Sequence, residues 1–468
     1  MQTYGTAPYR VVEYAIANGV HYLDLADGKE FVMGVSHYSV QAVAADIAVI
    51  SGLSTYPALT SAVLMHWQSE HKAVTALRAA IAPSPQSNLG RSVIDSIASY
   101  AGNPIGGGRN ALCSGFKSRI CPPGYTPLER ILFADVDVPD ATLLPAVFPG
   151  LRDVRNAAGT KPQFMLWALM GLSHLVKWQL LSNLRLLSPL VHVVQKHLNV
   201  GQHRSGIVVE ATAINHDNEQ INCSWHLIAE RDDGPQIPVI PAAIVIRKAL
   251  RGHYPTSGAR AATGEVTLAD YQREFDSLAI VCGFHNESSN RSVYERVLGN
   301  AFNTLPAPIT TLHRPEPEVC YTGEAVVERG RNPLANLVCA IFRFPKASRS
   351  TPVTVHIAVE DETETWTRCF GGHTMVSTQE AGTGRYDRLL VERFGPFAIG
   401  IALLVEHDQL VNLPQTWSVL GLPLPRMLLP RGQMYESAID DQFRFHVEIR
   451  APLFGLLVKY TGWLKPVS

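Results

Sequence analysis

The chain has few charged residues and no hydrophobic run long enough to cross a bilayer. Charged side chains make up 17% of its 468 residues, whereas they form roughly a quarter of an average soluble domain. The longest apolar stretch covers residues 164–176, contains His174 and is followed by Lys177, so it falls well short of the ~20 apolar residues of a membrane-spanning helix. These features predict no integral membrane segment and leave contact with a membrane surface open.

A charge excess of either sign is also absent. Lysine and arginine together number 40 and aspartate and glutamate 41, which gives a formal net charge of −1. Non-specific binding to nucleic acid requires a broad basic surface that neutralises phosphates. The charge balance therefore argues against a nucleic-acid partner.

Cysteine pairs, metal motifs and an export signal are missing as well. The seven cysteines are scattered without any C-x-x-C, a pattern typical of reduced thiols rather than a disulfide framework or a zinc site. The histidine pairs His66/His71 and His192/His197 lie five residues apart, and no H-E-x-x-H motif occurs. Residues 1–11 lack the charged and apolar segments of a secretory signal. We predict a cytoplasmic protein without a resident metal.

What the sequence does contain, near its start, is an alternation of helical and strand-like patterns. In order, these are a helix from about Pro8 to Asn18, a strand over 20–25, a helical stretch to Ala45, a strand over 47–50, a helix over 58–71 and a strand over 74–81. A strand, helix and strand of these lengths predict two parallel strands joined by a right-handed crossover. We expect this segment to be half of a doubly wound α/β domain, that is, an incomplete Rossmann-like parallel sheet.

The glycine-rich turn of a dinucleotide-binding sheet does not precede the first of these strands. Such a turn matters because only glycine lets the backbone approach a pyrophosphate at a helix N-terminus. The one partial match covers residues 106–111, follows Asn103-Pro104 and has no strand before it or helix after it. We interpret it as a flexible surface turn rather than a phosphate loop.

The middle of the chain predicts a second, α+β domain with an antiparallel sheet. A long helical pattern over 164–198, interrupted at Ser188-Pro189, is expected to pack between domains. The runs 207–215 and 221–230 predict two antiparallel strands, and the alternation of polar and apolar residues over 221–230 predicts one wet face. A helix is expected from Pro241 to Leu250, with proline at its start and a glycine after its end.

Short β-like runs dominate after a polar linker over 286–291. They cover residues 319–327, 337–344, 351–359, 365–370, 389–394, 398–407, 443–449 and 456–460. Turn residues separate them, which predicts a β-rich barrel or sandwich. We therefore divide the chain into a partial Rossmann-like domain (1–98), an α+β domain (99–285) and a C-terminal β domain (291–468).

Two blocks near the start carry a resemblance to a known family. They are NGVHYLDLADG at 18–28, preceded by YRV at 9–11, and VISGLSTYPAL at 49–59. They resemble the saccharopine dehydrogenase-like reductases, in which G-x-H-Y-x-D is a strand of the NAD(P)-binding domain and the SG-x-x-x-x-PAL turn lines the cofactor and substrate crevice. Residues 240–252 resemble the helix of that family's second domain, and the tail from 294 to 464 is similar to an uncharacterised domain fused to such proteins.

The resemblance implies an NAD- or NADP-dependent oxidoreductase acting on a small molecule. It begins at Tyr9, so the family's first strand, glycine turn and ribose-binding acidic residue are absent. We expect an N-terminally truncated reductase, impaired on its own because the glycine-rich phosphate loop is missing. No catalytic residue is identified, and a homodimer is one possible assembly.

Five residues are candidates for cofactor binding. Asp24 and Asp27 follow a predicted parallel strand, at the edge where open α/β sheets bind ligands. Gly52, Ser54 and Pro57 follow the next strand at the same edge. Structural roles are the alternative, with the carboxylates capping a helix and the glycine and proline serving a turn.

A second function therefore stays open beside the oxidoreductase. In it, the protein is a non-catalytic or membrane-peripheral binding protein whose C-terminal β domain holds an apolar ligand. The low charge and the β-rich tail favour this alternative. Trp366, Arg368 and Arg385 are the residues of the tail that either face such a cavity or serve structure alone.

Overall fold

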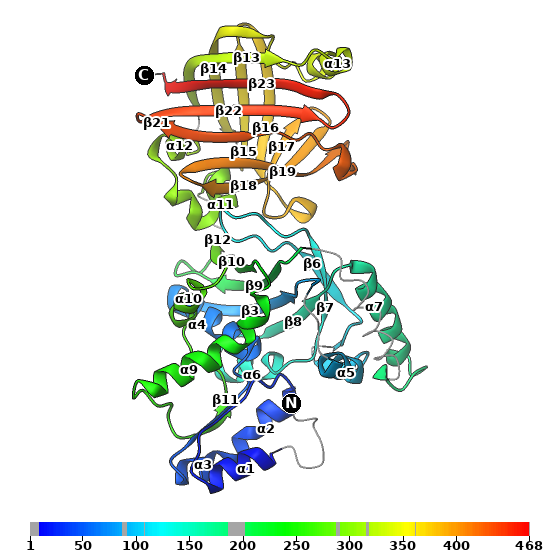
Figure 1. Cartoon of the computed structure of the whole chain (residues 1–468), viewed down its shortest axis with the longest axis vertical. Coiled ribbons are helices and arrows are strands. Elements are labelled where there is room, and N and C mark those ends of the chain that lie inside the picture. The colour runs from blue at the N-terminus through cyan, green and yellow to red at the C-terminus, as the bar shows by residue number, and fades with distance from the viewer. Residues whose placement is uncertain are drawn as a thin grey trace. The chain divides into compact units, whose positions relative to one another are not determined.

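The computed structural model describes residues 9–86, 91–106, 108–185, 202–286, 291–314, 318–360 and 362–467. The chain divides into two units, of which the first comprises Met1–Ile120 and Leu128–Cys282, and the second Cys121–Pro127 and Gly283–Ser468. The predicted fold class is confirmed, because the structure combines a parallel sheet, a second mixed sheet rich in antiparallel pairs and a closed C-terminal β-barrel. Figure 1 shows both units, coloured from the N- to the C-terminus.

A small parallel sheet forms one layer of the first unit. Its order is β1 (Tyr22–Leu23), β2 (Ala48–Ser51) and β11 (Gly258–Ala261), and both strand pairs are parallel. The helices that precede and connect the first two strands are α1 (Arg10–Ala17), α2 (Lys29–Gly34), the 3₁₀ turn η1 (Val35–Tyr38) and α3 (Ser39–Ala44). The predicted crossover between two parallel strands is confirmed.

The next predicted strand forms, but in the other sheet. It is β3 (Ala73–Ala82), which pairs with β8 and β9, while β11 takes the third place in the small sheet. Local alternation of strands and helices does not encode which sheet a strand joins. β11 is four residues long and contains Arg260, so it lacks the apolar run that predicts a buried parallel strand.

The second sheet of this unit has seven strands. Their order is β12 (Ile280–Asn286), β10 (Gln220–Ala229), β9 (Ser205–Ile214), β3, β8 (Asp153–Gly159), β7 (Ile131–Asp135) and β6 (Gly115–Ser118). β3 and β8 run parallel, whereas β3 pairs antiparallel with β9 and β9 pairs antiparallel with β10. The predicted antiparallel pair at 207–215 and 221–230 is therefore confirmed, but the wet face predicted for it is wrong, because Ser224 and His226 are buried.

Helices and short elements complete the first unit. They are η2 (Thr55–Leu59), α4 (Thr60–Glu70), α5 (Arg91–Tyr100), the hairpin of β4 (Pro104–Gly106) and β5 (Arg109–Asn110), α6 (Asp140–Val147), α7 (Gln163–Lys177), η4 (Gly234–Val239), α9 (Ile240–Leu250) and α10 (Leu268–Phe275). The helix predicted over 164–198 is present only in its first part, as α7, because the helix ends at Lys177 and residues 178–185 form turns and bends. The segment with Ser188-Pro189 lies outside the described residues. Within the described parts of the chain, every helix is too short or too polar to span a bilayer.

The second unit is built on a closed barrel of ten antiparallel strands. They are β13 (Glu318–Arg329), β14 (Ser348–Glu360), β15 (Thr363–Phe370), β16 (His373–Ala381), β17 (Leu390–Phe394), β18 (Phe397–Glu406), β19 (Gln409–Val419), β21 (Met434–Ile439), β22 (Gln442–Ala451) and β23 (Gly455–Pro466). β13 pairs with both β14 and β23, and the pairing of β18 with β19 closes the ring. Short β20 (Leu422–Pro423) and the turns η6 (Gly384–Tyr386) and η7 (Arg426–Leu428) lie between strands.

Helices stand at both ends of this barrel. α11 (Val293–Leu298), η5 (Gly299–Thr304) and α12 (Ala307–Leu312) come before β13, and α13 (Pro333–Ile341) follows it. Because β13 runs from one end of the barrel to the other, α12 and α13 lie at opposite ends, as Figure 1 shows. Buried side chains of α11 and α12 belong to the core of the barrel.

The strand predicted over 337–344 is wrong, because these residues belong to α13 and the turn after it. The Asn332 side chain accepts a hydrogen bond from the Leu334 backbone N–H at 2.9 Å, and Pro333 occupies the first helical position. Such a cap and a proline at that position favour helix initiation. Ala335 and Cys339 are buried four residues apart, the spacing of one helix face. A short apolar run alone does not distinguish a strand from a helix.

Candidate functional site

The barrel encloses a cavity of about 480 Å³, a size typical of sites for small molecules. Its lining is predominantly aliphatic and aromatic. A few polar side chains also reach it, namely Tyr294, Arg368, Gln379, Glu392, Asn412 and Glu436. An apolar cavity with a small number of placed polar groups is the usual form of a ligand site.

Arg368 and Glu392 neutralise each other's charge at the cavity wall. Arg368 on β15 donates from Nη2 to Oε1 of Glu392 on β17 at 3.1 Å, and from Nη1 to the Ser377 hydroxyl at 2.7 Å. The same Oε1 accepts from the Ser377 hydroxyl at 2.8 Å and from Gln379 Nε2 at 3.1 Å. Arg368 and Glu392 have side chains only 16% and 14% exposed, so the pair is largely withdrawn from water.

Tyr294 and His313 extend this network toward α11 and α12. The Tyr294 hydroxyl donates to Gln379 Oε1 at 3.0 Å, and the rings of Tyr294 and His313 stack with centroids 3.6 Å apart. His313 Nε2 pairs with a carboxylate oxygen of Glu436. Burial raises the pKa of Tyr294 well above its ordinary value, so this hydroxyl remains a neutral hydrogen-bond donor.

Trp366 forms part of the wall beside Arg368. The Arg368 guanidinium lies over the indole ring, 4.8 Å from its centroid, in the geometry of a cation–π contact. Trp366 Nε1 donates to Glu364 Oε2 at 3.0 Å, and burial raises the pKa of Glu364. Stacking and hydrogen bonding therefore hold the arginine in one orientation at the cavity wall.

The cavity also offers hydrogen-bond acceptors that the protein leaves unused. Asn412 Oδ1 is buried and has no partner among the described residues. Glu392 accepts all of its hydrogen bonds from described residues through Oε1, which leaves Oε2 without one. Unpaired acceptors in an apolar cavity are best matched by a ligand group that donates a hydrogen bond.

Sequence reasoning found part of this lining. Trp366 and Arg368, two of the three tail residues singled out, line the cavity. Arg385 is not among the lining residues, and its Nη1 donates to the Gly421 carbonyl at 3.2 Å. Gln379 escaped notice because it lies on β16, a strand that the sequence pattern did not predict.

In the first unit, the predicted cofactor-binding residues follow the ends of two neighbouring strands. Asp24 Oδ1 accepts hydrogen bonds from the backbone N–H of Ala26, the backbone N–H of Gly52 and the Ser51 hydroxyl, each at 2.9 Å. Its Oδ2 is buried and lacks a partner among the described residues. Asp24 thus ties the end of β1 to the end of β2.

Gly52 adopts a left-handed conformation with φ +84°. A Cβ atom there would lie 3.0 Å from Pro57 Cδ and 3.1 Å from Val32 Cγ1, so the space beside this glycine is already filled. Of the other candidates, Ser54 is half-buried and Asp27 is exposed. Surrounding protein atoms nevertheless desolvate the Asp27 carboxyl and raise its pKa. With its N–H bonded to Asp24, Gly52 supplies no free cradle for a pyrophosphate.

A buried carboxyl that sequence reasoning missed lies in the same unit, at the start of α6. Asp140 is fully buried and accepts from the Thr60 hydroxyl at 2.6 Å and from Asn156 Nδ2 at 3.2 Å, while its Oδ1 lacks a partner among the described residues. Burial is the dominant effect and raises the pKa of Asp140 to about 7. The only sequence signal is an aspartate directly after Pro139, in a stretch that reads as a polar loop.

We expect Asp140 to make the stability of the protein depend on pH. The folded state keeps a proton that the unfolded state releases from about pH 4 upward, so the free energy of unfolding falls as pH rises to about 7. Between about pH 5 and about pH 8 the loss is on the order of 2 kcal/mol. Asp140→Asn should remove this dependence in urea unfolding, whereas Asp217→Asn in an exposed turn should retain it. An unchanged slope in Asp140→Asn would contradict the assignment.

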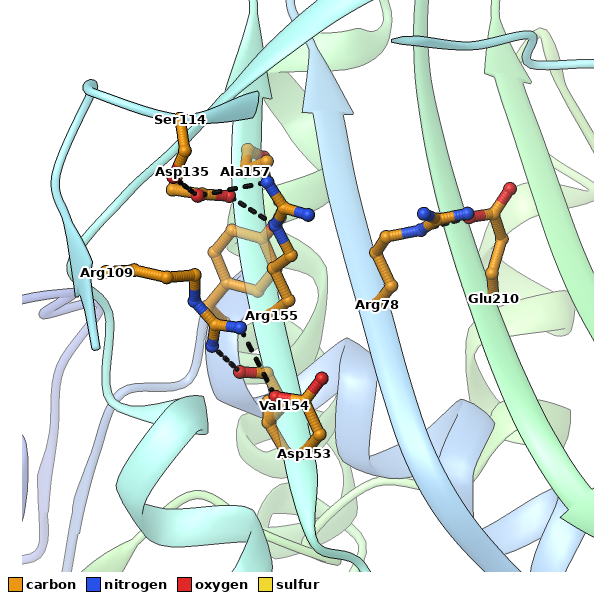
Figure 2. A network of polar contacts seen from close by, with 10 residues as sticks. Arg78, Arg109, Ser114, Asp135, Asp153, Val154, Arg155, Ala157 and Glu210 are labelled. Atoms are coloured by element: carbon orange, nitrogen blue, oxygen red, sulfur yellow. Dashed lines mark hydrogen bonds and ion pairs between the residues drawn. The ribbon is translucent and has the colours of Figure 1, made fainter. Parts of the chain in front are cut away.

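One face of the seven-stranded sheet carries a network of arginines, shown in Figure 2. Arg155 on β8 donates to both oxygens of Asp135, at 2.6 and 3.1 Å, and Arg78 on the adjacent β3 pairs with Glu210. The Phe116 ring lies 4.4 Å from the Arg78 guanidinium and 5.0 Å from that of Arg155. Both cations are therefore held by a carboxylate and an aromatic ring. The sequence signal that could have revealed this network is the presence of charged residues within apolar strand patterns.

The glycine-rich segment at 106–111 contributes to the same region. Gly106 ends β4, and Arg109 begins β5 of the short hairpin. Arg109 donates to Asp153 Oδ1 at 3.3 Å and to the Val154 carbonyl at 2.9 Å, as Figure 2 shows. These contacts fasten the hairpin to β8.

Comparisons with known proteins match parts of the chain. A family model described as "Domain of unknown function (DUF4166)" matches residues 305–464, which include most of the barrel. No curated protein matches the chain.

Two solved structures are similar to the chain at low identity. One is apo saccharopine dehydrogenase (L-Glu forming) from Saccharomyces cerevisiae, with 12% identity, a TM-score of 0.41 and coverage of 62% of this chain and 84% of that one. The other is Rv2717c from M. tuberculosis, with 12% identity, a TM-score of 0.19 and coverage of 32% of this chain and 92% of that one.

Proposed function

We propose that the C-terminal barrel binds a small, uncharged apolar molecule whose polar end donates a hydrogen bond. The observation that carries this proposal is the cavity of about 480 Å³ inside the barrel, in which Glu392 neutralises the charge of Arg368. Burying the apolar part of a ligand against this lining supplies the affinity, and the few polar groups set its orientation.

The charge arrangement selects against an anionic ligand. Arg368 is the cation in the lining that could pair with a ligand carboxylate, but both of its Nη atoms already donate, to Ser377 and to Glu392. A ligand carboxylate would lie close to the Glu392 carboxylate, and two like charges in a poorly hydrated cavity repel strongly. A hydroxyl avoids this repulsion and donates to Glu392 Oε2 or Asn412 Oδ1.

Displacement of a fluorescent apolar probe tests the proposal on the full chain. N-phenyl-1-naphthylamine is neutral and carries one N–H donor, so it should bind with enhanced fluorescence. Three competitors of equal chain length are compared: dodecanol, its methyl ether and dodecanoate. We expect dodecanol to displace the probe at a concentration at least about tenfold lower than dodecanoate, with the ether in between because it leaves the acceptors unpaired.

Two outcomes would overturn this proposal. Stronger displacement by dodecanoate than by dodecanol would mean that the Arg368–Glu392 pair opens to take an anion. Absence of any saturable probe binding would mean that the cavity admits no ligand of this class.

A second candidate function, NADP- or NAD-dependent oxidoreduction, is supported by the sequence blocks at 18–28 and 49–59 and by where their residues lie. Asp24, Asp27, Gly52, Ser54 and Pro57 follow neighbouring parallel strands. The residues present do not fit the pyrophosphate of such a cofactor, since the Gly52 N–H and Asp24 Oδ1 are bonded to each other. We therefore assign no reaction step to them.

Titration of the full chain with NADPH and with NADH measures this second function directly. If it holds, nucleotide fluorescence should change saturably, and Asp27→Ala should weaken binding whereas Asp217→Ala, in an exposed turn, should not. No saturable change with either nucleotide would remove the oxidoreductase from consideration for this chain.

A further inference from the structure

We propose that α13 and the turn between β22 and β23 form a docking surface for an anionic lipid bilayer. This inference deepens the proposed function and rests on it, because the bilayer would be the source or the destination of the apolar ligand. The surface consists of four exposed apolar side chains, Leu334, Leu337, Ile341 and Leu453, and four basic ones, Arg331, Arg343, Lys346 and Arg349. We call it the docking surface below.

Three of the four apolar residues of the docking surface lie on a single face of α13. Leu334, Leu337 and Ile341 are 54%, 60% and 64% exposed, and their spacing of three and four residues places them on one side of the helix. Ala335 and Cys339 are fully buried on the side facing the barrel. An exposed apolar stripe on a helix whose other side packs against the protein is typical of an interfacial helix.

Two residues of the docking surface mark the mouth of the cavity. Ile341 lines the cavity while 64% exposed, and Leu453 in the β22–β23 turn lines it while 71% exposed. A side chain that is both exposed and part of the lining lies at the rim. Phe342, Phe394 and Phe397 also line the cavity here, with the Phe342 ring centroid 4.9 Å from that of Phe397. The apolar stripe is thus continuous with the apolar interior.

The opposite end of the barrel is closed by protein. Tyr294 on α11 and Leu312 on α12 line the cavity there, and both are buried. α12 and α13 lie at opposite ends of β13. A ligand that enters beside α13 with its polar end first therefore passes the apolar section of the cavity before that end reaches the polar network. Entry from the docking surface therefore matches the orientation that the proposed function requires.

Charge complementarity identifies the bilayer as anionic. No aspartate or glutamate occurs from residue 329 to residue 359, although acidic and basic residues are balanced in the whole chain. Arg331, Arg343, Lys346 and Arg349 are exposed, and their side chains make no hydrogen bond or ion pair with any described residue. Unpaired cations beside an apolar stripe suit lipid phosphates and phosphatidylserine.

A hollow beside α13 adds a place for a headgroup. Arg343 and Lys346 line it together with Asn336 and His373. Its other basic residue, Arg329, is held by the backbone carbonyls of Pro345 and Phe344, which stiffens the turn after α13. A phosphate in this hollow would meet two free cations within reach of the apolar stripe.

Flotation of the full chain with lipid vesicles tests the docking surface. Vesicles of phosphatidylcholine alone are compared with vesicles that also contain phosphatidylserine. We expect binding that requires phosphatidylserine and weakens as salt is raised. Leu337→Glu should abolish it, and Arg343→Gln/Lys346→Gln should weaken it by roughly twenty-fivefold, since each basic residue near a membrane surface contributes roughly fivefold.

Matched controls separate the docking surface from other exposed residues. Leu250→Glu changes a leucine at the end of α9 that is 82% exposed, and Arg10→Gln/Arg152→Gln removes two exposed arginines that no described residue pairs. Both should bind vesicles like the unmodified chain. If the controls lose binding as much as the docking variants, the charge of the whole protein is responsible and the proposal is wrong. Absence of binding to phosphatidylserine vesicles would also overturn the proposal. The exposed apolar stripe of α13 would then have to be explained by contact with another protein.

Probe displacement by the same variants separates this proposal from the proposed function. Leu337 is not part of the cavity lining, so Leu337→Glu should bind N-phenyl-1-naphthylamine normally. Probe binding without vesicle binding would refute only the docking surface. Vesicle binding without probe binding would refute only the ligand site.

Discussion

Glu392→Gln is expected to convert the barrel from a site that rejects carboxylates into one that accepts them. Glutamine keeps a side-chain oxygen that accepts from Arg368 and Ser377 but removes the negative charge that neutralises Arg368. The arginine is then left as an uncompensated cation in a cavity where its side chain is only 16% exposed. A ligand carboxylate replaces the missing charge and should bind at least about tenfold more tightly than to the unmodified chain.

The same substitution should destabilise the ligand-free protein. Breaking a largely buried ion pair from one side costs on the order of 3 kcal/mol, because a charge remains without its partner. Dodecanoate should therefore raise the melting temperature of the variant and leave that of the unmodified chain unchanged. Glu380→Gln is the matched control, since the Glu380–Arg393 pair is exposed to solvent, and it should alter neither stability nor ligand preference. Equal dodecanoate binding by both variants would contradict the charge arrangement.

Arg155→Leu is expected to be the most destabilising change in the first unit. Its partner Asp135 has a fully buried side chain and receives two hydrogen bonds from Arg155. Without the arginine, a buried carboxylate keeps only the Ser114 hydroxyl. Losses from such one-sided removal are about 3–5 kcal/mol, and urea unfolding of the full chain measures them.

A neighbouring pair in the same network provides the control. Arg109 bonds to Asp153, whose side chain is 63% exposed, so Arg109→Leu should cost less than about 1 kcal/mol. Arg155→Lys should recover part of the loss, because it restores the charge without the bidentate geometry. Equal losses in Arg109→Leu and Arg155→Leu would show that burial of Asp135 does not set the cost.

Local elements followed closely from the sequence, whereas their assembly into sheets did not. The hairpin of β9 and β10 was predictable because Cys223, Trp225 and Leu227 alternate with polar residues along one strand. The partner of β2 was not, because β11 is four residues long and comes about 200 residues later in the chain. Pairing between such distant segments depends on the whole fold and leaves no local signature.

The site was only partly visible for a related reason. Arg368 and Trp366 were recognisable as unusual residues in a β-rich tail, but Glu392, to which we assign the selection against anionic ligands, resembles any exposed glutamate of a strand. The sequence pattern predicts a strand where α13 lies because six consecutive residues from Leu337 to Phe342 are apolar. Asp24 and Gly52 were expected to face a ligand, and their contact with each other is a property of the folded chain alone.

Photo-crosslinking with a long-chain alcohol that carries a diazirine at its far end tests the central claim most directly. The account predicts that illumination of the full chain labels peptides containing lining residues at the mouth of the cavity, such as Phe342, Phe394 and Phe397, and that dodecanol suppresses this labelling far better than dodecanoate. Labelling that is spread over surface peptides and unaffected by dodecanol would contradict the claim that the barrel is the binding site.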